Sequence, residues 1–131
     1  MKLQIDDLQK IQNDLDSRIF ELHNTSRKDT REDRLLALLV ELGELANETR
    51  SFKYWSLNKK VNVDDMFEEF SYVLHFALSL GIDIDYDKDF IEYESLDMKT
   101  ADMFRKMYQD VLKFQMDDCE ENYTAMMVTM C

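Results

Sequence analysis

Apolar residues recur at steps of three and four along most of the chain, a spacing that predicts helices. The first predicted helix begins near Asp6 and carries an apolar stripe formed by Leu8, Ile11, Leu15, Ile19 and Leu22. Gln12 and Asp16 lie beside this stripe, and the pattern alone predicts an exposed polar face for them. The polar residues 23–30 that follow predict a connection.

A second helix is predicted over residues 31–49, with Thr30 as its N-cap. Its apolar residues occupy most of the helix circumference, which predicts burial on several sides; they are Leu35, Leu36, Leu38, Leu39, Val40, Leu42 and Leu45. Glu41 and Glu44 lie within this helix, three residues apart, so their carboxylates leave the same side. A buried carboxylate requires a proton, a charged partner or a metal ion.

Helical spacing is lost over residues 50–63, where aromatic and basic side chains alternate. These side chains are Phe52, Lys53, Tyr54, Trp55, Lys59 and Lys60. One interpretation is a loop whose rings pack onto the core. The other is a loop that stacks a ring on a flat ligand and directs its cations at an anion.

A third helix is predicted to begin at Asp64 or Asp65 and to end at Gly81 in the left-handed conformation. Its polar residues share one side: Asp65, Glu68, Glu69, Tyr72, His75 and Ser79. A histidine on such a side is either a hydrogen-bonded structural residue or a ligand-binding one. Packing of this helix beside residues 31–49 would bring at least three carboxylates to one place.

The C-terminal part contains two more predicted helices, over residues 97–114 and from residue 117 onward. Residues 82–96, which precede them, are acidic and irregular and predict a loop with one short extended or helical piece. Most of the nine methionines lie in this part, and we expect them to fill gaps in the core or in an interface. The pattern stops at Cys131 without a C-terminal signal, so we expect the natural protein to continue.

Composition narrows the fold class. A chain of 131 residues is long enough for one domain with a real core. The absence of proline and the presence of only two glycines leave an all-β fold without its usual turn residues. The sequence therefore predicts an all-α fold in which residues 1–131 form a single antiparallel bundle of about five helices.

The charge of the chain excludes some partners. A formal net charge of -12 disfavours non-specific binding to nucleic acid or to an anionic membrane, because lysine and arginine drive both. No apolar run approaches the roughly 20 residues of a membrane span, and none has the flanks of a signal peptide. Cys119 and Cys131 form no spaced disulfide framework, so we expect a cytoplasmic, reduced protein.

A hard divalent cation would stabilise converging carboxylates, which otherwise repel each other. Mg²⁺ prefers oxygen ligands and keeps waters and substrate phosphates in its coordination shell. It would also attract a triphosphate that an acidic protein repels, and would activate a water for attack at phosphorus. The helical carboxylates are thus suited to Mg²⁺ and to a triphosphate that the metal would attract, although Glu-x-x-Glu as a bare pattern also occurs on many exposed helices.

Two segments carry a resemblance to a known family: ALLVELGELANETRSFKYWS, residues 37–56, and EEFSYVLHFALSLGI, residues 68–82. They resemble the dimeric, all-α deoxyuridine triphosphatases, which are relatives of the MazG-type nucleotide pyrophosphatases. The resemblance covers about the first 82 residues. It implies a homodimer that hydrolyses dUTP to dUMP and pyrophosphate with bound Mg²⁺.

The resemblance also implies roles for single residues. Glu41 and Glu44 match a metal-binding pair, with Glu44 orienting the attacking water, and Glu69 matches the first ligand of a Glu-x-x-Asp motif. The implied substrate contacts are Trp55 against the uracil ring, Gln12 and Asp16 at the base, and His75 at the sugar or phosphate.

The chain departs from the family pattern at Tyr72, which stands where the motif has its aspartate. A phenol is neutral at working pH and is a poor Mg²⁺ ligand. The chain also lacks the family's C-terminal helical segment with its phosphate-binding side chains. The leading prediction is a Mg²⁺-dependent dUTP pyrophosphatase. The alternatives are a catalytically impaired relative that binds a nucleotide or a regulatory protein partner, and a helical interaction module without a ligand.

Overall fold

Five helices and two three-residue strands make up the fold in a computed structural model that describes residues 1–131. In chain order they are β1 (Lys2–Gln4), α1 (Asp6–Leu22), α2 (Arg27–Thr49), α3 (Val63–Asp83), β2 (Phe90–Glu92), α4 (Thr100–Met116) and α5 (Glu120–Met130). The predicted all-α class with five helices is confirmed. The last two helices begin at Thr100 and Glu120, slightly later than the spacing of apolar residues predicts.

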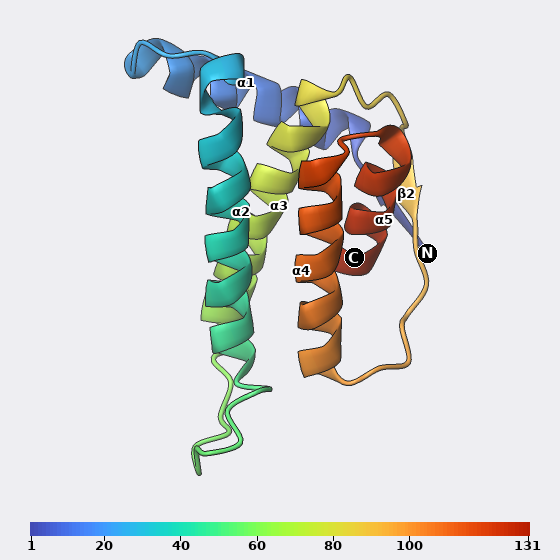
Figure 1. The fold of residues 1–131 in the computed structure, drawn as a ribbon. Coiled ribbons are helices and arrows are strands. Elements are labelled where there is room, and N and C mark those ends of the chain that lie inside the picture. Colours follow the sequence, from blue (N-terminus) through green and yellow to red (C-terminus); the bar gives the residue numbers. More distant parts are fainter.

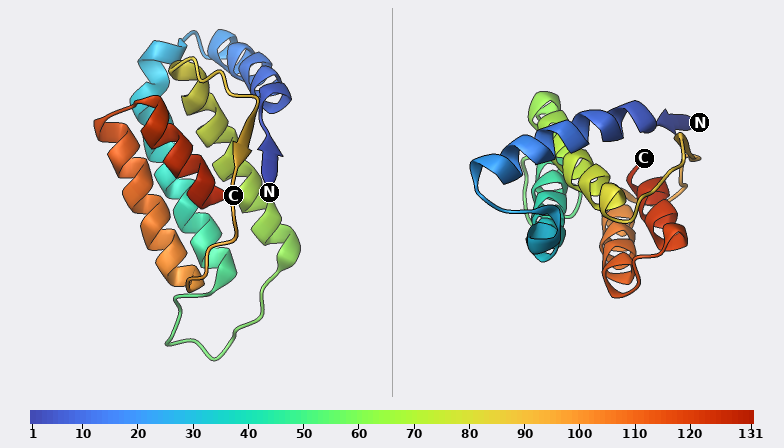
Figure 2. Two further views of the ribbon diagram at one scale, coloured as in Figure 1. Left: turned by 90° about the vertical axis from the view of Figure 1, so that its right-hand side faces the viewer. Right: turned by 90° about the horizontal axis from the view of Figure 1, so that it is seen from above.

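The helices form two hairpins that pack against each other (Figure 1). α2 and α3 run side by side in opposite directions, α4 and α5 form the second hairpin, and α1 lies across one end of α3 (Figure 2). β1 pairs antiparallel with β2, with Leu3 opposite Ile91, so the predicted extended piece within residues 82–96 is confirmed. None of the helices combines the length and apolarity needed to span a bilayer.

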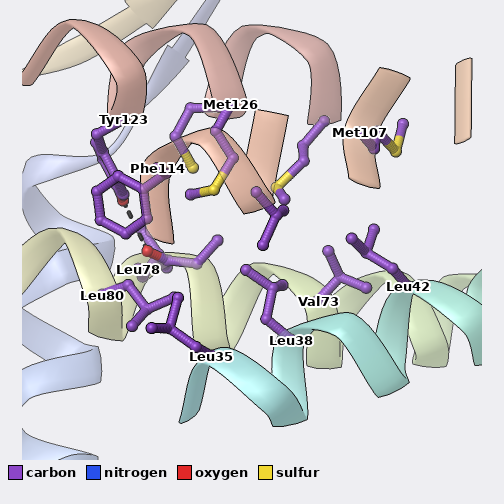
Figure 3. Close-up of a cluster of buried hydrophobic side chains, with 14 of the residues drawn as sticks. Leu35, Leu38, Leu42, Val73, Leu78, Leu80, Met107, Phe114, Tyr123 and Met126 are labelled. Atoms are coloured by element: carbon purple, nitrogen blue, oxygen red, sulfur yellow. Dashed lines mark hydrogen bonds between the residues drawn. The ribbon is translucent and has the colours of Figure 1, made fainter. Parts of the chain in front are cut away.

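One apolar core joins both hairpins (Figure 3). Leu38 and Leu42 of α2 and Val73 of α3 meet the side chains of α4 and α5 there. Four methionines, Met107, Met126, Met127 and Met130, are buried in this core. Flexible thioether side chains fill the irregular space between two hairpins well, and the prediction that methionines fill the core is confirmed for these four.

Two helices begin at caps other than the predicted ones. α2 starts at Arg27, and its N-cap Ser26 accepts a hydrogen bond from the backbone N–H three residues on, at 3.1 Å. Thr30 is therefore inside the helix, where its hydroxyl donates to a backbone carbonyl at 2.9 Å. α3 is capped by Asn62, not by Asp64 or Asp65. Several polar residues in a row can serve as a cap, and sequence does not rank them.

Gly81 does not end α3, contrary to the prediction. The helix continues to Asp83, no glycine has a positive φ, and the left-handed residue after the helix is Asp85, with φ 53°. Gly81 instead allows a close approach, because a Cβ there would overlap the phenol of Tyr123 on α5. The glycine is needed for packing between helices.

α1 buries two polar side chains and exposes most of its apolar stripe, although Leu8 of that stripe packs against the core. Gln12 and Asp16 are buried, at 5% and 6% exposure, while Ile11 on the apolar stripe is 62% exposed. The predicted exposed polar face is therefore wrong. α2 likewise leaves Leu36 and Val40 exposed, so it is not buried all round. The molecule has apolar side chains on its surface and polar ones between α1 and α3.

Candidate active site

Carboxylates from α2 and α3 converge where these helices pack side by side. Glu69 of α3 has a buried oxygen, Oε2, without a hydrogen-bond partner. The pKa of Glu69 is raised, first by burial, then by the adjacent carboxylate of Glu41 and by the charges of Glu44 and Glu68. The structure thus places Glu69 of α3 beside Glu41 of α2, and Glu44 and Glu68 lie near enough for their charges to act on it.

The carboxylates of α2 differ in exposure. Glu41 is half-buried and Glu44 is exposed, because this part of α2 lies on its open side. The expectation of two fully buried carboxylates is wrong. Exposure leaves Glu44 accessible to water and to a ligand, which is what a group that orients a water needs.

The chemistry of these residues fits Mg²⁺. No group of three or more His, Cys, Asp or Glu side chains is already gathered closely enough to hold a metal ion. Like charges keep carboxylates apart when no cation joins them. The buried Oε2 of Glu69 receives no hydrogen bond. A set of ligands made only of oxygen atoms suits a hard cation. The donor atoms of these residues are therefore of the kind that Mg²⁺ binds.

Tyr72 lies on the same side of α3. Its hydroxyl donates a hydrogen bond to Oε1 of Glu68 at 3.0 Å, and the side chain is 42% exposed. The pKa of Tyr72 is raised, first by this hydrogen bond and then by the Glu68 charge. The phenol therefore stays neutral beside the carboxylates and adds a hydrogen-bond donor where the family motif has a negative charge.

Three of the predicted substrate-binding residues form one hydrogen-bonded chain. Nδ1 of His75 on α3 lies 2.6 Å from Oε1 of Gln12 on α1, and Nε2 of Gln12 donates to Oδ1 of Asp16 at 2.9 Å. Ser79 of α3 donates its hydroxyl proton to Oδ2 of Asp16 at 2.6 Å. These contacts explain how α1 buries its polar side, since its groups are paired there.

Trp55, the fourth predicted substrate-binding residue, lies apart from that chain. The loop that carries it is at the end of the α2–α3 hairpin opposite α1 (Figure 1). Trp55 is 63% exposed and contacts Phe52 and Tyr54 edge to face, with ring centroids 5.9 and 5.2 Å away. The rings therefore do not pack onto the core, and the first interpretation of this loop is wrong.

A family comparison decides what kind of protein carries this site. The model of the dUTPase family matches residues 4–131. The chain belongs to the dUTPase family. No curated protein and no solved structure matches it. As a dUTPase-family chain it is related to nucleotide hydrolases, and the family match includes α4 and α5, beyond the segments that carry the resemblance.

Charged residues that sequence reasoning missed lie beside the Asp16 cluster, between α1, α2 and α3. Arg27 donates to Oδ2 of Asp16 at 2.8 Å and to Oδ1 of Asp83 at 3.1 Å, so it joins α1 to α3. Arg34 of α2 donates to both carboxylate oxygens of Asp83, at 2.9 and 2.8 Å. The prediction placed Arg27 in a connection, which hid its place on α2. The seven-residue spacing of Arg27 and Arg34 would have indicated a shared helix side.

Proposed function

We propose that this dUTPase-family protein is a Mg²⁺-dependent nucleoside triphosphate pyrophosphatase that converts dUTP to dUMP and pyrophosphate. The observation that supports it most is Glu69, whose buried oxygen lacks a partner beside Glu41 and Glu44 of the neighbouring helix. A buried carboxylate oxygen without a donor and close to two like charges is stabilised by a proton or by a cation, and a bound Mg²⁺ would be that cation.

Each carboxylate has a proposed role. Glu41, Glu44 and Glu69 would hold the metal, and Glu44, the exposed one, would also orient the water that attacks phosphorus. Mg²⁺ would supply charge neutralisation at the phosphates and activate the bound water. The protein groups hold the nucleophile close to the substrate, which lowers the entropic cost of the reaction.

Substrate recognition is proposed to involve both ends of the α2–α3 hairpin. Gln12 and Asp16 would contribute to base recognition, and His75 would contact the sugar or phosphate. Trp55 would lie against the base ring, for which its exposed indole is suited. Arg50 bridges the loop that carries Trp55, since its Nε donates a hydrogen bond to the carbonyl of Asn58 at 2.7 Å.

We also propose that the protein is a homodimer. The exposed apolar stripe of α1 is a surface that water solvates poorly, and α2 exposes two further apolar side chains, Leu36 and Val40. Replacement of Leu15 with glutamate would place a charge in this surface, and we expect the dimer to dissociate at least about tenfold more readily in sedimentation. Leu112→Glu, on an exposed side of α4, is the control. A monomeric wild-type protein, or a Leu15→Glu dimer of unchanged affinity, would contradict this proposal.

The proposed location is the cytoplasm. Cys119 and Cys131 are both free thiols, which is usual where glutathione keeps cysteines reduced. Nucleotide hydrolysis of the proposed kind would act on the nucleotide pool of the same compartment.

A second function is favoured by one observation, the hydrogen bond from Tyr72 to Glu68. A phenol in place of a ligand carboxylate removes one negative charge from the site and weakens metal binding. On this basis the protein would be a catalytically impaired relative that binds a nucleotide or a regulatory protein partner.

One experiment separates the two functions. Pyrophosphate release from dUTP is measured with Mg²⁺ for the wild type and for Tyr72→Asp, with calorimetric titration of Mg²⁺ into each. We expect the wild type to release pyrophosphate and to stop when the metal is chelated. Tyr72→Asp should bind Mg²⁺ about 10-fold more tightly, because it adds a charged ligand. An inert wild type with an active Tyr72→Asp would establish the second function, and inertness of both with every nucleotide would refute the first.

A further inference from the structure

A buried carboxylate fixes the orientation of its neighbours between α1 and α3. Asp16 is 6% exposed and accepts hydrogen bonds from Arg27 at 2.8 Å, Ser79 at 2.6 Å and Gln12 at 2.9 Å. The Arg27 guanidinium pairs with this carboxylate, and an ionised carboxylate can only accept hydrogen bonds. Each polar group that contacts the Asp16 carboxylate must therefore donate a hydrogen bond to it.

This requirement sets the direction of the Gln12 side-chain amide. Its Nε2 must face Asp16, because the reversed amide would place two acceptor oxygens against each other. The Oε1 of Gln12 then faces Nδ1 of His75 at 2.6 Å. A carbonyl oxygen accepts and never donates, so Nδ1 of His75 carries the hydrogen.

The other ring nitrogen of His75 is left free for a ligand. In a neutral imidazole with its hydrogen on Nδ1, the Nε2 atom is an acceptor. Nε2 has no hydrogen-bond partner in the protein. It is also not among the buried polar atoms without a partner, which are Nε2 of Gln9 and Oε2 of Glu69, so it is open to solvent.

We propose that Arg27, Asp16 and Gln12 are positioning residues that hold His75 in the Nδ1–H tautomer, so that its Nε2 accepts a hydrogen bond from a sugar hydroxyl of the nucleotide. This inference rests on the proposed function, since it takes the ligand to be a nucleotide. A phosphate oxygen is itself an acceptor and would face the lone pair of Nε2 unfavourably. For the neutral ring, the chain of hydrogen bonds therefore selects the sugar; a ring that also carried a hydrogen on Nε2 would donate to a phosphate oxygen, and the binding measurement below distinguishes the two.

The tautomer can be measured directly on the full chain by ¹⁵N NMR of the imidazole rings. The protein has two histidines, and His23 is exposed, so it serves as an internal reference. We expect the Nδ1–H form for His75 in the wild type. Gln12→Leu should shift His75 toward the Nε2–H form that a free ring prefers, while His23 stays unchanged.

Two further variants separate the chain of hydrogen bonds from general effects on the fold. Arg27→Met should shift the His75 tautomer in the same direction as Gln12→Leu, and Arg27→Lys should restore it by keeping a charge beside Asp16. Gln109→Leu, on an exposed side of α4, should have no effect. A wild-type His75 in the Nε2–H form, or a tautomer that none of the Gln12 and Arg27 variants changes, would overturn the proposal.

A binding measurement tests the sugar contact. We expect the wild type to bind dUMP about 10-fold more tightly than the analogue that lacks the 3′-hydroxyl, because the analogue loses one hydrogen bond. Gln12→Leu should bind dUMP and the analogue about equally. The sugar contact would be refuted if the wild type bound dUMP and the analogue with equal affinity, or if Gln12→Leu kept the wild-type preference for dUMP. A wild type that binds and hydrolyses no nucleotide would refute both the proposed function and the sugar contact, whereas the NMR measurement, which needs no ligand, would still decide the tautomer. A wild type that binds dUMP but hydrolyses no nucleotide would refute the proposed function alone.

Discussion

Glu44→Gln is expected to lower the rate of pyrophosphate release from dUTP at saturating Mg²⁺ by at least about 100-fold. Loss of a group that supports a metal ligand typically costs 10- to 100-fold, and Glu44 is proposed to be a ligand itself and to orient the attacking water. The amide keeps the size of the side chain while it removes the negative charge. Because Glu44 is exposed, its replacement should leave the thermal unfolding temperature nearly unchanged.

Glu32→Gln is the matched control for this experiment. Glu32 is also an exposed glutamate of α2, it forms no ion pair, and it lies before the segment that carries the site. Its replacement makes the same change in net charge, so general electrostatic attraction of the substrate is altered equally. Comparable activity of the Glu44→Gln and wild-type enzymes would show that Glu44 neither binds the metal nor orients the water. An equal loss in Glu32→Gln would mean that net charge, and not the site, controls the rate.

Local spacing was sufficient to predict which carboxylates of α2 and α3 lie near one another. Glu41 and Glu44 share a side of α2 because residues three apart do so on any helix. The proximity to Glu69 follows from the antiparallel packing of two consecutive helices. The exposure of Glu44 could not be predicted in this way, because it depends on Leu36 and Val40 lying on an open side of α2.

The burial of Gln12 and Asp16 could not be read from α1 alone. The apolar stripe of this helix is the stronger signal in sequence, and a hydrophobic stripe usually faces the core of the same chain. Polar side chains can be buried when donors and acceptors are all paired, and here the decisive donor, Arg27, comes from another helix. The predicted stripe is correct as a pattern. Most of the side chains in this stripe are exposed and do not contribute to the core of the chain.

Gly81→Ala is expected to destabilise the fold by about 1 to 2 kcal/mol and to lower the unfolding temperature by roughly 5 °C. Replacement of a glycine inside a helix with alanine normally raises the free energy of unfolding by about 1 kcal/mol. At Gly81 we expect the opposite sign. The reason is Tyr123, whose ring carbon Cζ would lie 2.5 Å from the added Cβ. Tyr123 is fully buried, packs against Tyr86 and Phe114, and donates its hydroxyl to the carbonyl of Ala77 at 2.8 Å. The Tyr123 ring therefore cannot move away from the added Cβ.

The chain offers a matched control for Gly81→Ala in its second glycine, Gly43 of α2. A Cβ at Gly43 would meet only the hydroxyl of Tyr108, at 3.1 Å. Tyr108 is half-buried and can shift by a few tenths of an ångström, so Gly43→Ala should leave stability unchanged or raise it by up to about 1 kcal/mol. Unfolding by heat and by denaturant measures both variants. A stabilised Gly81→Ala protein would show that α3 and α5 separate easily, and that Gly81 is not required for their close approach.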